Sequence, residues 1–334
     1  MKRREFITAL GGSVLYSVTA FGQHGPKKRL ALVHPSAKAA DMRIGGDADD
    51  AFTIFFQELQ RLGYVEAQNL IVERYSAEGQ PERYSDIARE VVGTHPDVIA
   101  VAGAGLAAKL KAATSTIPMA AITGDPIRFG LVPSLSRPGG NITGVSFDAG
   151  IEIWSKRVEI LAEAVPGLRR VAFVGPQAAL DGQGGKATRE AAGRLGIDLV
   201  SASVATPVNE QAYRHTFEAI GRDRADGFVF ASDVESYPLR HLIVELVKQV
   251  GLPAIFTLRE QAAAGGLLSY ATDLKFAIRA SAGQVAEILR GGNPAEMPYI
   301  QGTRFELVIN LNTANALGLT ISPTLLARAD EVIE

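Results

Sequence analysis

Residues 96–103 have the sequence PDVIAVAG, and residues 225–232 have the similar sequence ADGFVFAS. Each stretch is a short apolar run that follows an aspartate and ends at small residues, which is typical of a buried parallel strand and the turn after it. An Arg-Leu-Gly triplet precedes each stretch, at residues 61–63 and 194–196. The sequence therefore contains two copies of one strand–helix pattern. Two similar halves predict two lobes with a cleft between them, which is the architecture of a binding protein.

The two halves also keep similar spacing. From the arginine of the triplet to the aspartate is 36 positions in the first half and 32 in the second, and the runs IPMAAIT (117–123) and LPAIFT (252–257) follow. Strands alternating with helices of this length imply right-handed parallel crossovers, so we expect an α/β fold with two doubly wound parallel-sheet lobes. Strands are expected at 30–33, 70–75, 98–102, 119–122, 171–174, 199–204, 228–230, 254–256 and 305–309, with strands 142–146 and 267–270 crossing between the lobes. Helices are expected at 52–62, 81–92, 106–113, 151–164, 186–195, 210–220, 239–250, 274–290 and 311–317.

Length and composition exclude several classes of protein. A chain of 334 residues is long enough for two domains, and 47% apolar with 21% charged residues is typical of a globular protein. The net charge of -2 gives no electrostatic footprint for nucleic acid, so no nucleic-acid partner is expected. Cysteine is absent, which excludes disulfides, thiolate metal sites, a cysteine nucleophile and a lipoprotein anchor.

The first residues have the pattern of an export signal. Residues 1–5 are a basic start, residues 6–22 are apolar and rich in small residues, and residues 20–22 fit a cleavage site. The apolar stretch is too short and too interrupted for a transmembrane helix. The pair Arg3-Arg4 also resembles a twin-arginine signal, which exports folded proteins. We expect cleavage after Gly22 and a periplasmic protein, with an anchor that is never cut as the alternative.

The sharpest competing motif is GAGLAA at residues 103–108, which fits the G-x-G-x-x-A fingerprint of dinucleotide-binding folds. Asp125 lies 20 residues beyond Gly105, where an acid would bind the ribose. The motif follows the third strand of a lobe rather than the first, however. Small residues there also give a tight turn that exposes helix-start amides to any anion. An exported dinucleotide-dependent enzyme is therefore an alternative, and the main interpretation expects no cofactor.

The rest of the chain shows no catalytic or metal site. Residues 182–187 resemble a phosphate loop, but the pattern needs glycine at Leu180 and serine or threonine at Ala187. Residues 144–148 lack the closing glycine of a nucleophile elbow. The five histidines are scattered without metal-ligand spacing, and no paired carboxylates share a predicted face. We therefore expect a protein that is not an enzyme and has no catalytic residue and no metal.

Small and polar residues follow several predicted strands, at the edge where parallel α/β sheets bind ligands. Hydroxyls and helix-start amides would bind a carboxylate, an aspartate would pair with an ammonium, and an aromatic ring would stack on an apolar side chain. Each residue taken singly also fits a structural role, as a helix cap or a turn former. The expected ligand-binding set, which rests on joint placement, is Ser36, Gly103, Ala104, Thr123, Asp125, Phe147, Ser232, Asp233 and Tyr270.

Several longer blocks of the sequence point to one known family. The blocks are QELQRLGYVE at 57–66, GDP at 124–126, PGGNITG at 138–144, AGGLLSY at 264–270, FELVINLNTA at 305–314 and LGLTISPTLL at 317–326. They resemble the ABC-transporter substrate-binding family that includes tryptophan-binding lipoproteins. The resemblance covers essentially the whole chain. It implies a type I periplasmic-binding fold whose lobes close on a ligand, and delivery of that ligand to an inner-membrane permease with its own ATPase. The chain departs from the family at residues 37–49 and 102–105, both in the proposed pocket.

The repeat and the resemblance together give one functional expectation. Lobe 1 is expected to comprise residues 28–144 with about 271–298, and lobe 2 residues 145–270 with about 299–334. The protein is expected to be a monomeric solute-binding component of an importer. Its ligand would be a small polar organic solute, and an amino acid is the leading candidate. Some relatives in the family bind aromatic amino acids. The alternative use of the same cleft is a ligand-sensing domain for a receptor.

Overall fold

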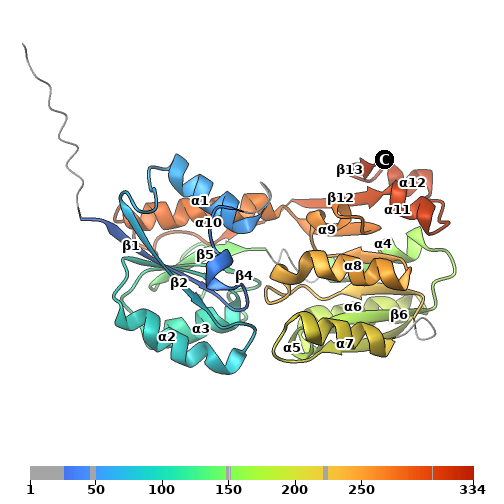
Figure 1. The fold of residues 1–334 in the computed structure, drawn as a ribbon, viewed down its shortest axis with the longest axis horizontal. Coiled ribbons are helices and arrows are strands. Elements are labelled where there is room, and N and C mark those ends of the chain that lie inside the picture. Colours follow the sequence, from blue (N-terminus) through green and yellow to red (C-terminus); the bar gives the residue numbers. More distant parts are fainter. Residues whose placement is uncertain (1–25, 46–49, 148–149, 151, 221–224, 303) are drawn as a thin grey trace, which may run out of the picture.

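The computed structural model describes residues 26–334 except 46–49, 148–149, 151, 221–224 and 303. These residues form two lobes that lie side by side, each built on one mainly parallel sheet (Figure 1). The expected α/β fold with two doubly wound lobes is confirmed. The export signal, with its twin arginines and its cleavage site after Gly22, lies outside the described residues. Within the described ranges, no helix is both long and apolar enough to span a bilayer.

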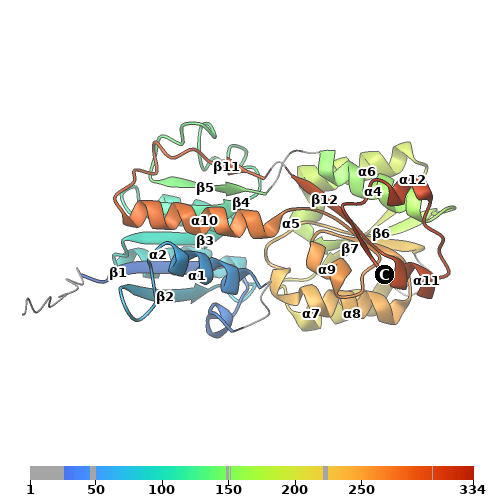
Figure 2. The same ribbon diagram turned by 90° about the horizontal axis from the view of Figure 1, so that it is seen from above.

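The first lobe has a six-stranded parallel sheet in the order β11-β5-β4-β3-β1-β2. Its strands are β1 (Lys28–His34), β2 (Leu70–Ser76), β3 (Val98–Ala102), β4 (Met119–Thr123), β5 (Ile142–Ser146) and β11 (Ile300–Gln301). Helices α1 (Ala51–Arg61) and α10 (Leu274–Leu289) cover one face, and α2 (Tyr84–Gly93) and α3 (Ala104–Ala113) cover the other. Figure 2 shows α10 lying along this sheet. Because both faces are covered, the central strands read as continuous apolar runs.

The second lobe has a seven-stranded sheet in the order β13-β12-β10-β9-β8-β6-β7. Its strands are β6 (Arg170–Pro176), β7 (Asp198–Val204), β8 (Gly227–Phe230), β9 (Ala254–Phe256), β10 (Leu268–Thr272), β12 (Phe305–Asn310) and β13 (Glu331–Ile333). Helices α4 (Glu152–Ala164) and α6 (Gln183–Arg194) cover one face, and α7 (Glu210–Ile220) and α8 (Arg240–Val250) cover the other. The shorter helices α5 (Gln177–Asp181), α9 (Arg259–Ala263), α11 (Leu311–Ala316) and α12 (Pro323–Leu326) complete the lobe.

The two strands expected to cross between the lobes instead lie inside the sheets. β5 pairs with β4 and β11, whereas β10 pairs with β9 and, antiparallel, with β12. The lobes are connected by the short segments that directly follow β5, β10 and β11. Gly302 N–H donates to the Ser146 carbonyl at 2.9 Å, and Thr272 Oγ1 donates to the Phe147 carbonyl at 3.4 Å. These hydrogen bonds hold the connections together at one end of the cleft.

Both Arg-Leu-Gly triplets end a helix in the same way. Gly63 and Gly196 have φ values of 95° and 69°, in the left-handed region that favours glycine. The residue after each glycine donates its N–H to the carbonyl five positions earlier, at 2.8 Å after α1 and 2.9 Å after α6. This is the Schellman arrangement, which satisfies carbonyls at the end of a helix.

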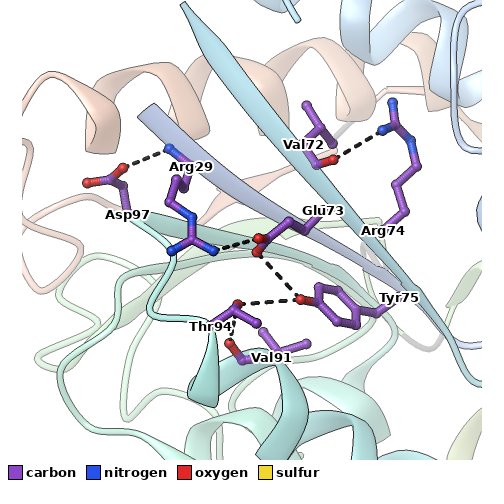
Figure 3. A network of polar contacts seen from close by, with 8 residues as sticks. All are labelled: Arg29, Val72, Glu73, Arg74, Tyr75, Val91, Thr94 and Asp97. Carbon is purple, nitrogen blue, oxygen red and sulfur yellow. Dashed lines mark hydrogen bonds and ion pairs between the residues drawn. The ribbon is translucent and has the colours of Figure 1, made fainter. Parts of the chain in front are cut away.

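The repeated aspartate ties two neighbouring strands together in each lobe. Asp97 Oδ2 accepts from the Arg29 N–H at 2.7 Å, and Asp226 Oδ2 accepts from the Arg170 N–H at 2.8 Å. Each aspartate N–H donates back to the carbonyl of the same arginine, at 2.9 Å and 2.7 Å. In lobe 1 the Arg29 side chain extends this network to Glu73 on β2 (Figure 3). The sequence repeat is therefore also a repeat of local hydrogen bonding.

Candidate functional site

The carboxyl ends of the parallel strands of both lobes face one cleft. A cavity of about 560 Å³ lies there, with walls from the ends of β1, β3 and β4 in the first lobe and of β8 and β9 in the second. The first turns of α1, α3, α4, α6 and α8 complete the wall. Ligand sites of open α/β sheets form at these strand ends. The fold therefore places one cavity where both lobes can contact the same molecule.

Five of the nine residues expected to bind a ligand line this cavity, namely Gly103, Ala104, Phe147, Ser232 and Asp233. Gly103 precedes α3 with a φ of 87°. A Cβ atom at this position would lie 3.0 Å from Cγ1 of Val234, which belongs to the other lobe. Glycine here therefore satisfies both the backbone conformation and the close approach of the two lobes.

Two of the other four expected residues are engaged in their own loop. The Thr123 hydroxyl is buried and donates to the Gly124 carbonyl at 3.2 Å. Asp125 Oδ1 accepts from the N–H groups of Ile127 and Arg128, at 3.0 Å and 3.1 Å. That pattern is an Asx turn. Both side chains serve the turn after β4 and lie outside the cavity lining.

The remaining two expected residues also lie outside the cavity lining, for different reasons. The Ser36 hydroxyl donates to the Glu235 carbonyl at 2.6 Å, a contact that joins the two lobes. The Tyr270 ring stacks on Phe305, with 5.6 Å between ring centres, and packs on the core of lobe 2. Its carbonyl accepts from Arg157 Nε at 2.8 Å.

The loop after β8 places two carboxylates at the cavity wall. Asp233 Oδ1 accepts from the Ser236 N–H at 2.8 Å, and Glu235 Oε1 accepts from the Tyr84 hydroxyl at 3.1 Å. Burial, together with the charge of Glu235, raises the pKa of Asp233 to about 7. Burial beside these carboxylates also raises the pKa of Tyr84, so its hydroxyl stays protonated and can donate. The wall is therefore a place where a cation would be stabilised.

Sequence reasoning missed Arg157, one of several charged residues that line the cavity. Only 2% of it is exposed, yet its guanidinium borders the cavity. Its Nη1 lies 3.5 Å from Ser232 Oγ, and its Cζ lies 5.5 Å from the centre of the Trp154 ring. A signal was present in the sequence: this arginine falls on the apolar face of the helix at 152–164, between Trp154 and Leu161. A charge on a buried helix face points to a function or to a buried partner.

Aromatic rings form much of the remaining wall. The rings come from Phe52, Phe55, Tyr84, Phe129, Phe147, Trp154, Tyr213, Phe230 and Tyr237. His34 also borders the cavity, but its Nδ1 accepts from the N–H groups of Ser36 and Ala37, at 3.1 Å and 2.9 Å. Burial lowers the pKa of His34 to about 3, so the ring is neutral near pH 7 and shapes the loop. Among the described residues, no group of three or more His, Asp or Glu could hold a metal ion.

The chain is similar to known binding proteins over most of its length. A family model described as ABC transporter substrate binding protein matches residues 43–333. A tyrosine-binding protein from Clostridioides difficile is 24% identical over 290 residues, which cover 81% of this chain and 77% of that protein.

Solved structures share the fold. A conserved domain protein from Vibrio cholerae has a TM-score of 0.75 and 25% identity, covering 92% of this chain and 99% of its own. An ABC domain from Streptococcus pneumonia in complex with L-Trp has a TM-score of 0.74 and 20% identity, covering 92% of this chain and 100% of its own. The two-lobed architecture is that of type I periplasmic binding proteins, as the sequence resemblance implied.

Proposed function

The chain belongs to the ABC transporter substrate-binding protein family, and from this premise we propose that it binds an amino acid, foremost an aromatic one, in the inter-lobe cavity. Members of this family are binding proteins, so the expectation of a non-enzyme is confirmed and the alternative of a dinucleotide-dependent enzyme is wrong.

One observation carries the ligand class: charges of both signs border a single, mainly apolar cavity. Arg157 is suited to the carboxylate of an amino acid, and Ser232 adjoins it with a hydroxyl. Asp233 and Glu235 are suited to the ammonium. The first-turn amides of α3 offer a second place for a carboxylate, because they have no partner within their helix. A zwitterion would place a carboxylate beside Arg157 and an ammonium beside Asp233 and Glu235, whereas a sugar or an uncharged molecule carries neither charge.

The size and the aromatic lining support a large side chain. A volume of about 560 Å³ is in the range of small-molecule sites, and an aromatic ring gains energy from stacking on neighbouring rings as well as from burial. Trp154 and Phe52 lie on opposite lobes, so a ring between them would be covered when the lobes close. The tyrosine-binding relative and the structural neighbour with bound L-Trp support the same class of ligand.

A thermal-shift panel tests the proposal. The chain that begins after residue 22 would be heated with each L-amino acid, with N-acetyl and amide derivatives, and with 5-methylthioribose, which occupies another structural neighbour. At a hundredfold excess over the dissociation constant, a true ligand stabilises the folded state by about 2.7 kcal/mol. We expect that shift with an aromatic amino acid and its loss with both derivatives. A shift with the thioribose alone, or an undiminished shift with the N-acetyl form, would refute the proposal.

A pair of charge variants locates the site. Asp233→Asn removes the carboxylate that would pair with the ammonium and should abolish most of the shift. Asp198→Asn is the matched control, because Asp198 pairs with Arg170 on an exposed edge of lobe 2, far from any cavity-lining role. Equal ligand shifts in both variants would remove Asp233 from the site.

We further propose that the protein is periplasmic, acts as a monomer, and delivers its solute to an inner-membrane permease with an ATPase. The signal pattern at residues 1–22 and the family support this role. Fractionation of cells that express the whole chain, with and without Arg3-Arg4→Lys-Lys, tests both export and its route. A cytoplasmic mature chain would refute export, and an unaffected variant would exclude the twin-arginine route.

A further inference from the structure

Two helix starts meet across the cleft. Asp50 and Ala51 lie at the start of α1 in lobe 1. Tyr237 begins the 3-10 turn η4 (Tyr237–Leu239) in lobe 2, and Arg240 begins α8 directly after it. We name Asp50, Ala51, Tyr237 and Arg240 the closing cluster. Within the described part of the chain, the cavity wall includes Ala51, Tyr237 and Arg240 but not Asp50.

Asp50 makes bonds to both lobes. Its Oδ2 accepts from the N–H groups of Phe52 and Thr53, at 3.0 Å and 3.2 Å, and so caps α1. Its Oδ1 accepts from Arg240 Nη2 at 3.2 Å across the cleft. The two side chains are only 15% and 12% exposed, so their attraction is less screened than that of a surface pair. A cation at a helix start is disfavoured by the helix dipole, and the Asp50 carboxylate offsets this for Arg240.

Tyr237 completes the same cap from the other lobe. Its hydroxyl oxygen accepts from the Ala51 N–H at 2.9 Å, and that N–H is one of the first-turn amides without a partner inside its helix. The Arg240 Cζ lies 4.3 Å from the centre of the Tyr237 ring, a cation–π contact that holds the ring in place. The start of α1 is therefore fully capped only while lobe 2 lies against it.

We propose that the closing cluster holds the two lobes closed and sets how fast they open, by the same factor for every solute. This inference rests on the proposed binding function. The bonds of Asp50 join groups of the protein itself, so they change the free energy of closure rather than that of one particular ligand. A shift in the closed population multiplies every apparent dissociation constant by one factor.

Asp50→Asn separates closure from the other roles of this residue. Asparagine is as good a helix cap as aspartate, so α1 keeps its start. The variant removes the charge that faces Arg240, and closure then buries that guanidinium without its partner. Asp198→Asn serves as the matched control, because its pair with Arg170 is 60% and 52% exposed and lies within lobe 2. We expect the ratio of closed to open molecules to fall roughly tenfold for Asp50→Asn and to stay unchanged for the control.

The distance between the lobes measures closure with or without a solute. The chain has no cysteine, so Ser85→Cys on α2 and Gln211→Cys on α7 give two unique, exposed labelling positions, one in each lobe. Single-molecule energy transfer between these labels would report open and closed molecules directly. A distribution unchanged by Asp50→Asn would overturn the inference, even if no solute of the panel binds. If no solute of the panel binds, that result refutes the proposed function instead.

Solute release gives the second readout. Trp154 is the one tryptophan of the chain and borders the cavity, so its fluorescence reports binding without a label. Release rates would be measured for two solutes of different size with wild type, Asp50→Asn and the control. We expect Asp50→Asn to speed both releases by the same factor, roughly tenfold. Faster release of one solute alone would mean that Asp50 acts through that solute and would overturn the inference.

Discussion

Lowering the pH from 8 to 6 should weaken solute binding about tenfold through Asp233. The pKa of this carboxyl is raised to about 7 because it is buried beside Glu235, while the Ser236 N–H opposes part of that rise. A free amino acid keeps its ammonium over this pH range. The change therefore acts on the acceptor in the protein rather than on the ligand.

The magnitude follows from the ionised fraction of Asp233. With a pKa of about 7, roughly 90% of the carboxyl is ionised at pH 8 and roughly 9% at pH 6. If an ammonium binds only the ionised form, the apparent affinity falls by the ratio of these fractions, which is about 1.4 kcal/mol. The affinity should level off above pH 8.

The same pKa makes a prediction of opposite sign for the ligand-free protein. In an unfolded chain this carboxyl has its ordinary pKa of 3.8, whereas burial in the folded chain raises the pKa to about 7. Between these values the folded state binds more protons, so the free energy of unfolding falls as the pH rises. The loss from Asp233 alone is at most about 4 kcal/mol across this window. A bound ammonium restores part of it.

Titration of the Trp154 fluorescence at five pH values measures the affinity, and thermal melts without solute measure the stability. Asp233→Asn should bind more weakly than wild type at pH 8 and show a flat profile from pH 8 to pH 6. Asp198→Asn should keep the tenfold change. A wild-type affinity that is constant between pH 8 and pH 6 would refute the role of Asp233 as the ammonium acceptor.

Three further substitutions test the site and the fold. Gly184→Ala would place a Cβ 2.2 Å from the Trp154 ring and should lower the free energy of unfolding by roughly 1–3 kcal/mol. Gly193→Ala in the same helix meets no atom within 4 Å and should raise the free energy of unfolding by about 0.5–1 kcal/mol, so equal effects of the two variants in thermal melts would contradict the packing argument. Arg157→Met should weaken binding of the amino acid at least tenfold, yet leave binding of its decarboxylated amine nearly unchanged. Equal losses of affinity for the amino acid and the amine in calorimetry would contradict recognition of the carboxylate by Arg157. Asp226→Ala should lower the free energy of unfolding in urea by about 1–3 kcal/mol without changing affinity, and a stability like that of wild type would contradict its role at the start of β6.

The sequence determined the local structure and, through it, the class of fold. The glycines of the two Arg-Leu-Gly triplets end α1 and α6 because only a residue tolerant of positive φ closes a helix in that way. The apolar runs at 98–102 and 228–230 became central strands because strands covered on both faces need no polar side. These signals depend on the nearest few residues, so a single sequence contains them.

The sequence also indicated which segments face the cleft, because a residue that follows a parallel strand lies at the ligand-binding edge of the sheet. Gly103, Ala104, Ser232 and Asp233 reach the cavity for this reason. The rule does not say where a side chain turns. Asp125 follows β4 in the same manner, yet its carboxylate bonds to the two N–H groups of its own turn.

Only the tertiary structure decided the rest of the site. Arg157 reaches the cavity because α4 packs against β10. There the Arg157 Nε–H donates a hydrogen bond to the carbonyl of Tyr270, which lies 113 residues away along the chain. Tyr270 lies outside the cavity because β12 pairs antiparallel with β10 and places the Phe305 ring against the Tyr270 ring. The contact between Asp50 and Arg240 joins the two lobes across 190 positions of the chain. Contacts between distant segments depend on how whole helices and strands pack, and the local pattern of residues does not predict that packing.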